Sequence, residues 1–152
     1  MFLACWALLY LGSSSDWKQK AIAEIHQLID THTNTTSADP LHHRLTTIPV
    51  SVWDDEMPVL ESIIRESIRL AFNVTLLRRN LTDNLPLLDK TVDRGAFMAY
   101  NVGDVHLNPN IYSEPEIFDP DRFSAPREEG KGIYGAFLGW GIGRHPCTGE
   151  LF

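Results

Sequence analysis

The chain has 152 residues, of which 43% are apolar and 22% are charged, close to the averages for soluble globular proteins. This composition excludes a disordered, collagen-like or coiled-coil chain, and the length fits one domain or a piece of a larger one. The formal net charge of −7 does not indicate a surface that binds nucleic acid. Two cysteines, Cys5 and Cys147, are too few for a disulfide scaffold.

The segment from Met1 to Leu11 is an almost unbroken apolar run, shorter than the roughly 20 residues that a membrane-spanning helix needs. We interpret it as part of a buried helix whose first part is missing, because the run starts without a capping residue. A signal peptide is the alternative, although no basic residue precedes the run. Three Asn-x-Thr triplets, at Asn34, Asn73 and Asn80, would be glycosylation sites in a secreted chain.

Two helices are predicted from apolar residues spaced three and four apart. The first spans about 17–30 and follows Ser15 as its cap, and the second begins at Pro58 and ends near Phe72. The polar segment 31–40 has no periodicity and predicts a surface loop.

The second half of the chain predicts short strands and then an irregular segment. β-branched and aromatic stretches over 74–77 and 91–100, interrupted by Asn, Asp and Gly, predict strands and a hairpin. From Asn101 onward, Pro, Gly, Asp and aromatic residues are frequent and periodicity is almost absent, which predicts packed but irregular backbone.

The second predicted helix contains the motif Glu66-Ser67-Ile68-Arg69, in which an acid and a base share one helical face. An ordinary exposed ion pair, contributing about 0 to 1 kcal/mol, is the simplest interpretation. A second motif, Phe118 to Phe123, holds Arg122 beside Pro120 and two aromatic side chains. The planar donors of this arginine suit a carboxylate such as Glu66, which would make a buried network, but a solvated loop arginine remains an equal alternative.

The glycine-rich segment from Phe137 to Gly149 carries the strongest signal. Its glycines do not have the spacing of a phosphate-binding loop, and no Lys followed by Ser or Thr closes it. Zinc is disfavoured because Cys147 has no Cys-x-x-Cys partner, and the adjacent His42 and His43 do not readily aim at one metal.

A single cysteine in a glycine-rich loop, followed by a predicted helix start, is suited to bind haem iron as a thiolate. Glycines allow backbone to approach a flat ligand closely, and the positive end of a helix lowers the pKa of a thiol. Arg144 and His145 would then face the anionic propionates. The alternative for Cys147 is a small buried side chain.

Taken together and in this order, the three motifs resemble the C-terminal portion of the cytochrome P450 haem-thiolate monooxygenases. Glu66 to Arg69 resembles the Glu-x-x-Arg of the family's helix K, and Phe118 to Phe123 resembles its Pro-Glu-Arg-Phe segment, with Asp121 where Glu is usual. Trp140 to Gly149 resembles the cysteine signature, with Trp140 where Phe is usual. The Gly-Arg-His run before the cysteine is most similar to sterol 14-alpha-demethylase and related fungal enzymes.

The resemblance implies a mostly α fold with small β-sheets (α+β), a single partial domain running from the end of helix I through the cysteine loop, with helix L missing. It implies the end of helix I followed by helix J over 1–30, helix K over 57–72, a sheet over 73–100, an irregular meander over 101–136 and the haem-cysteine loop over 137–152.

The resemblance also implies site residues. Cys147 becomes the axial iron ligand, and Glu66, Arg69 and Arg122 become a structural network. The remaining haem-binding candidates are Trp140, Gly143, Arg144, His145, Gly149 and, as a weaker propionate contact, Arg78. Residues 73–77 would line the substrate side of the haem. No catalytic residue is identified, because the chain begins after the proton-relay pair of helix I.

By the same resemblance, the parent protein is an oxidoreductase that inserts one oxygen atom of O2 into a small lipophilic substrate. Its electrons come from an NADPH-dependent reductase, and it is associated with the endoplasmic reticulum membrane through an anchor absent from this chain. We expect the 152 residues alone to be inactive, poorly soluble and weak in haem retention. Two alternatives are a truncated relic that binds nothing and a secreted, glycosylated interaction protein.

Overall fold

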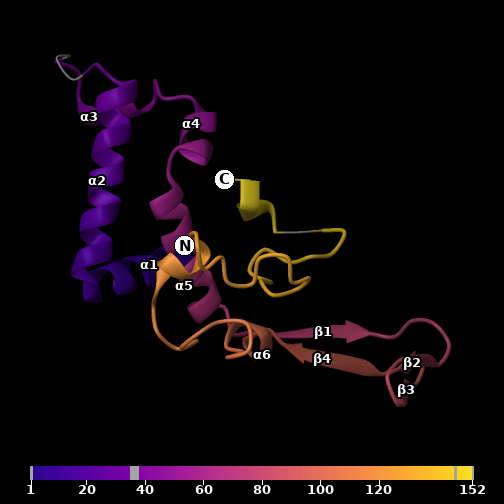
Figure 1. The fold of residues 1–152 in the computed structure, drawn as a ribbon. Helices are drawn as coiled ribbons and strands as arrows, with labels where there is room; N and C mark the ends of the chain where they lie inside the picture. Colours follow the sequence, from indigo (N-terminus) through magenta and orange to yellow (C-terminus); the bar gives the residue numbers. More distant parts are fainter. Residues whose placement is uncertain (1, 35–37, 146, 152) are drawn as a thin grey trace. The chain divides into compact units, whose positions relative to one another are not determined.

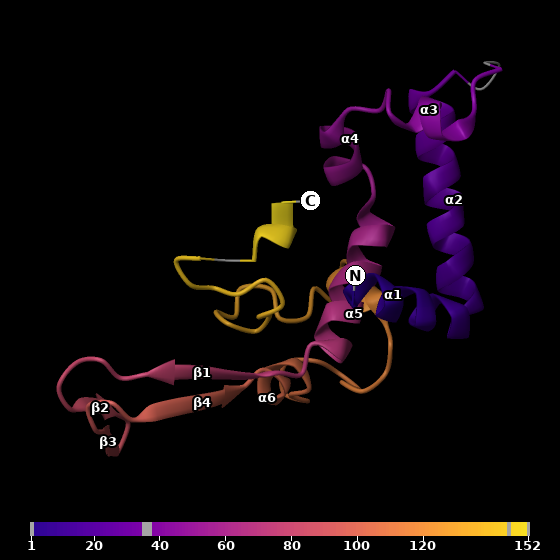
Figure 2. The same ribbon diagram turned by 180° about the vertical axis from the view of Figure 1, so that it is seen from behind.

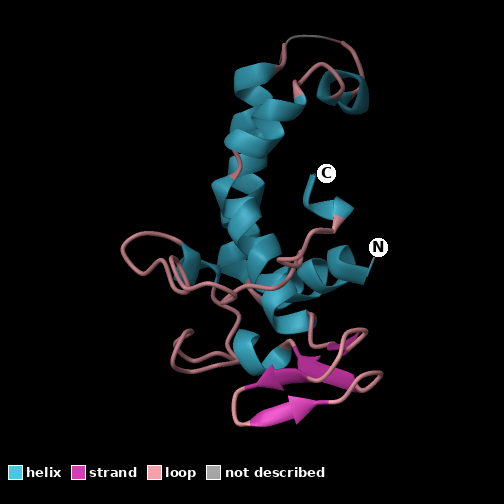
Figure 3. Cartoon of the chain, turned by 90° about the vertical axis from the view of Figure 1, so that its right-hand side faces the viewer, coloured by secondary structure: helices cyan, strands magenta, loops and turns pink. Residues whose placement is uncertain are grey.

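The computed structural model describes residues 2–34, 38–145 and 147–151. The chain divides into two compact units, which are described separately. The first comprises residues 1–68 and 118–128, and the second comprises residues 69–117 and 129–152. Helices dominate, and the strands form two small two-stranded sheets (Figure 3), so the α+β expectation agrees with the structure.

Two consecutive helices open the first unit. The apolar run forms α1, Phe2–Ser13, and α2, Ser15–His32, follows after a break at Ser14 (Figure 1). Helix α2 is amphipathic and buries Ala21 and Leu28, as the spacing predicts. None of the described helices is both long enough and apolar enough to span a bilayer.

Two short helices that the sequence analysis did not predict follow the polar loop. Helices α3, Leu41–Leu45, and α4, Val50–Asp55, each come directly after a proline, Pro40 or Pro49. Each is too short to show a helical repeat of apolar residues, so periodicity gives no signal for it. The hydrophobic core of this unit joins the long helix to these segments through Leu28, Ile48 and Met57.

Helix α5, Pro58–Ala71, begins at the predicted proline and carries the Glu-x-x-Arg motif. Its first free backbone amides are satisfied by the carboxylate of Glu24 on α2, which accepts hydrogen bonds from Val59 N and Leu60 N, each at 2.8 Å. A carboxylate in this position also interacts favourably with the positive end of the helix. The start of α5 is therefore fixed by a residue from another helix.

The second unit contains two nested antiparallel pairs of strands. Strand β1, Thr75–Arg79, pairs with β4, Phe97–Asn101, in the register Leu77 to Ala99. Strand β2, Leu85–Leu87, pairs with β3, Lys90–Val92, beyond the far end of the β1–β4 ribbon (Figures 1 and 2). The sequence predicts one hairpin in this region, and the structure has a second, smaller one within it.

The side chain of Asn80 stabilises the turn between the two strand pairs by hydrogen bonds. Its side chain is buried, and its amide nitrogen donates to the carbonyls of Asp83 and Val92 at 3.0 Å. Its side-chain oxygen accepts from the backbone and hydroxyl of Thr82. Because this amide is enclosed and fully engaged, Asn80 is not accessible for glycosylation in the folded chain. The triplet that begins at Asn34 extends beyond the described residues.

The rest of the second unit is largely irregular. Helix α6, Gly103–His106, follows β4, and the segments 107–117 and 129–145 consist mainly of turns and bends. The chain closes with the 3-10 helix η2, Thr148–Leu151. Backbone of this kind needs polar partners outside regular ladders, and the buried polar side chains of the site provide them.

Candidate functional site

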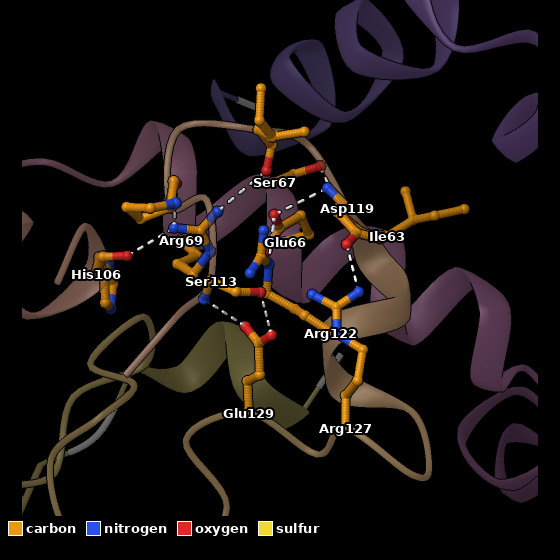
Figure 4. A network of polar contacts seen from close by, with 12 residues as sticks. Ile63, Glu66, Ser67, Arg69, His106, Ser113, Asp119, Arg122, Arg127 and Glu129 are labelled. Carbon is orange, nitrogen blue, oxygen red and sulfur yellow. Dashed lines mark hydrogen bonds and ion pairs between the residues drawn. The ribbon is translucent and has the colours of Figure 1, made fainter. Parts of the chain in front are cut away.

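Glu66 and Arg122, both predicted as members of one network, meet in the first unit. Both side chains are 0% exposed, and Arg122 Nε lies 3.0 Å from Glu66 Oε1. The same carboxylate oxygen accepts a hydrogen bond from the backbone N–H of Asp119 at 3.1 Å (Figure 4). A buried carboxylate with these two donors is a structural element, because an isolated buried charge would be strongly unfavourable.

The segment that carries Arg122 is held by further charged contacts. It forms the 3-10 helix η1, Pro120–Phe123, with proline in its first turn. Asp119 pairs with Arg127 at 2.5 Å, and the guanidinium of Arg65 on α5 lies 4.5 Å from the ring centroid of Phe123. Pro120 and Phe123, the proline and one of the two aromatic residues that the sequence places around Arg122, both belong to this short helix.

Arg69, the third predicted member, lies in the second unit and binds carbonyl groups. Its side chain is 1% exposed, and its Nη1 donates to the backbone oxygens of His106 and Pro115, both at 2.6 Å (Figure 4). Its guanidinium lies 5.0 Å from the ring centroid of Tyr112. Arg69 thus connects separate parts of the irregular segment 106–117 by hydrogen bonds to their backbone carbonyls.

His106 was missed by the sequence analysis, although it is fully buried. Its ring stacks on Phe137, with centroids 5.3 Å apart, and its Nε2 accepts a hydrogen bond from Leu138 N at 2.9 Å. Burial, together with the charge of Arg69, lowers the pKa of His106 to about 4, although the backbone carbonyls of Phe72 and Arg69 oppose the shift. No spacing rule identifies a lone histidine of this kind.

Tyr112 is a second buried residue that the sequence analysis missed. Its hydroxyl donates to the carbonyl of Ala136 at 2.9 Å. Gly130 lies beside it, and a Cβ at that glycine would sit 3.1 Å from the Tyr112 hydroxyl and 3.2 Å from the Ala136 side chain. The positive φ of Gly130, 77°, and this close approach together account for glycine at the position.

The cysteine loop closes on itself through its backbone. Cys147 N donates to Trp140 O at 2.6 Å, and Gly141 N donates to Leu138 O at 3.1 Å. Gly141 has a φ of 84°, a conformation that favours glycine. A Cβ at Gly149 would be 3.5 Å from Cys147 Sγ and 3.7 Å from the Trp140 ring, so this glycine borders both of them. Pro146 lies outside the described residues.

The side chains of this loop that were predicted to contact a cofactor differ in exposure. Those of Cys147, Arg144 and His145 are exposed, whereas that of Trp140 is half-buried. Around Gly143, no heavy atom would lie within 4 Å of an added Cβ. The alternative of a buried, inert Cys147 is therefore not what the structure shows. Arg78 on β1 is also exposed, and its Nη1 donates to Leu77 O at 2.9 Å.

Comparison with known proteins assigns the family. The family model described as "Cytochrome P450" matches residues 3–152. The chain belongs to the cytochrome P450 family. It is 37% identical over 143 residues to the cytochrome P450 monooxygenase AacuE of Aspergillus aculeatus, covering 91% of this chain and 28% of that protein. It is 26% identical to cytochrome P450 4F4 of Rattus norvegicus over 97% of this chain and 26% of that protein.

The fold agrees with this assignment. A retinoic acid-bound cyanobacterial P450, CYP120A1, superposes with a TM-score of 0.72 at 24% sequence identity, covering 98% of this chain and 31% of that structure. The chain therefore has part of the P450 fold and spans less than a third of the length of these relatives.

Haem is the cofactor of this family, and the residues of this P450 chain fit it. Cys147 offers an exposed thiol, the soft donor that iron in a haem-thiolate site requires. The neighbouring exposed Arg144 and His145 are suitable hydrogen-bond donors for carboxylates. Among the described residues, no group of three or more His, Cys, Asp or Glu side chains is arranged to hold a metal ion by itself.

Proposed function

We propose that this chain is the C-terminal part of a cytochrome P450 monooxygenase in which the Cys147 thiolate is the axial ligand of haem iron. The observation that carries the proposal is the exposed Cys147 thiol, on a loop closed by the hydrogen bond from Cys147 N to Trp140 O, in a chain that matches the family model almost throughout. The parent enzyme would transfer one oxygen atom from O2 to an organic substrate, with electrons supplied by a reductase.

When bound, haem supplies the iron at which O2 is activated, and a thiolate ligand favours cleavage of the O–O bond. The polypeptide holds the sulfur and orients the ligand. The short hydrogen bond at Cys147 N fixes the backbone that carries the sulfur. Trp140, half-buried beside Gly149, offers a flat apolar surface next to it.

The exposed cations are proposed to bind the propionates. Arg144 and His145 are close in sequence to the ligand, and Arg78 lies on β1 in the same unit. Charge-assisted hydrogen bonds to a carboxylate are stronger than neutral ones, which makes these three side chains suitable partners. Residues 73–77 are proposed to face a lipophilic substrate, and the 58% exposure of Leu77 on this strand supports that role.

Finer features of the parent enzyme are proposals of the same kind. The likeness of the cysteine loop to sterol 14-alpha-demethylase and related fungal enzymes suggests a fungal-type monooxygenase, and membrane association of the parent goes with a lipophilic substrate. Exposed apolar side chains on α1, including Leu8 and Leu9 at 69% and 63%, support the expectation that the 152 residues alone are poorly soluble and inactive.

The test uses the two cysteines of the chain. In the full-length protein that carries this chain, the ferrous-CO complex should show the red-shifted band of thiolate ligation. Cys147→Ser should abolish this band, whereas Cys5→Ser, which alters the other exposed cysteine, should leave it unchanged. A thiolate band that persists in Cys147→Ser would overturn the proposed ligand.

A further inference from the structure

The short segment Ala136–Leu138, which leads into the cysteine loop, is held by two buried side chains. Tyr112 donates its hydroxyl proton to Ala136 O, and His106 accepts from Leu138 N, both at 2.9 Å. Ala136 is 2% exposed and Leu138 is 9% exposed. The backbone is therefore fixed immediately before the exposed part of the loop begins.

The hydrogen bond to His106 defines the state of its ring. Because Leu138 N–H donates to Nε2, that nitrogen carries a lone pair, and the proton of the neutral ring is on Nδ1. A ring held neutral by burial keeps this acceptor available at neutral pH. Stacking on Phe137 fixes the plane of the ring as well.

Two backbone hydrogen bonds connect the anchored segment to the cysteine. Leu138 O accepts from Gly141 N at 3.1 Å, and Trp140 O accepts from Cys147 N at 2.6 Å. Residues 141–145 and 147 are exposed, so they have little packing of their own to fix the direction of the loop. Their orientation must come mainly from the point where the loop leaves the buried backbone.

We propose that His106 and Tyr112 are positioning residues that set the geometry of the Cys147 loop by holding the backbone of Ala136 and Leu138. The inference rests on the proposed haem-thiolate function for its consequence at the iron, but the anchoring itself does not require it. Arg69 supports both anchors, because it binds the carbonyl of His106 and lies over the ring of Tyr112. Groups that orient the ligands of a metal affect its binding and reactivity, and their mutation typically costs about 10- to 100-fold in metal affinity or activity.

The test compares variants that keep or remove each hydrogen bond in the full-length, haem-loaded protein. His106→Leu removes the acceptor at similar size and leaves the buried N–H of Leu138 without it, whereas His106→Gln supplies an oxygen in its place. Tyr112→Phe removes one hydroxyl and keeps the ring. Hydrogen exchange of peptides covering residues 136–141 reads out the anchoring directly, independently of activity.

We expect exchange in this segment to be roughly tenfold faster in His106→Leu and Tyr112→Phe, with partial recovery in His106→Gln. The thiolate band of the ferrous-CO complex should convert faster to the band of a protonated or lost thiolate in the same order. Asn80→Ala is the matched control, because it breaks a buried polar network elsewhere in the unit and should change both readouts much less than the two anchor variants do.

Wild-type exchange and wild-type band stability in both His106→Leu and Tyr112→Phe would overturn the inference. So would changes of equal size in Asn80→Ala, because the effect would then be general destabilisation. If His106→Leu does not fold, Tyr112→Phe and His106→Gln still decide the matter. Faster exchange together with a thiolate band that survives Cys147→Ser would keep the anchoring and reject the proposed function instead.

Discussion

Four arginines of the predicted site differ in burial, two of them enclosed and two of them exposed. Arg122 and Arg69 are fully enclosed, and each binds protein groups, a carboxylate in one case and backbone carbonyls in the other. Arg78 and Arg144 are exposed. An arginine that the polypeptide encloses therefore binds protein groups and stabilises the fold, whereas an exposed arginine is available to a ligand.

The largest effect is expected from the carboxylate beside Arg122. Glu66→Gln leaves a fully buried guanidinium without its charged partner and should lower the free energy of unfolding by about 3 to 5 kcal/mol. Urea unfolding of the full-length protein measures the change. Glu61→Gln, at an exposed position on the same helix, is the control and should change it by less than about 0.5 kcal/mol. Similar losses in both variants would remove the distinction between buried and exposed charges.

A pH dependence is expected from the buried region around Arg69. The unfolded chain takes up a proton at His106 near the ordinary pKa of 6.5, whereas the folded chain does so only near 4. Protonation of His106 therefore does not change the free energy of unfolding above about pH 6.5. As the pH falls from about 6.5 to 4, the free energy of unfolding decreases by up to about 3 kcal/mol.

Unfolding free energies measured across this pH range check the prediction when wild type is compared with His106→Gln. The difference between the two proteins should change with pH, since glutamine does not titrate. A constant difference from pH 7 to pH 4 would show that His106 titrates at its ordinary value. The contribution of the carboxylates to the pH dependence cancels in this comparison, because they titrate in both proteins.

An intermediate effect is expected at Asn80, which is buried but carries no charge. Asn80→Ala removes several hydrogen bonds from the turn between the two strand pairs and should cost about 1 to 3 kcal/mol of stability. Asn110→Ala, at an exposed position of the irregular segment, is the matched control. Thermal unfolding that shows equal shifts for the two variants would contradict this description of the turn.

The smallest effect is expected from the exposed arginines. Arg78→Ala should change stability by less than about 0.5 kcal/mol but speed haem dissociation about fivefold, if its charge meets a propionate. Arg79→Ala is the control, because adjacent strand residues point to opposite faces and Arg79 donates to Gly95 O at 3.1 Å. Equal haem dissociation rates in Arg78→Ala and wild type would remove Arg78 from the site.

The sequence predicts correctly the elements that have a regular apolar spacing and the charged residues that belong to recognisable motifs. Helices α2 and α5 follow from apolar spacing, and the Glu66–Arg122 pair follows from two motifs that are far apart in the chain. Short elements were missed, since α3 and α4, with 5 and 6 residues, are too short to show the i, i+3, i+4, i+7 spacing of apolar residues that indicates a helix. His106 and Tyr112 were also missed, because their roles depend on backbone groups of Ala136 and Leu138, and backbone partners leave no mark on the sequence.

The identity of the atom bound to haem iron can be measured by X-ray absorption at the iron edge of the haem-loaded, full-length protein. If Cys147 is the ligand, the first coordination shell contains one sulfur in the wild-type protein and in Cys5→Ser, and none in Cys147→Ser. A wild-type spectrum with only nitrogen and oxygen ligands would contradict this assignment.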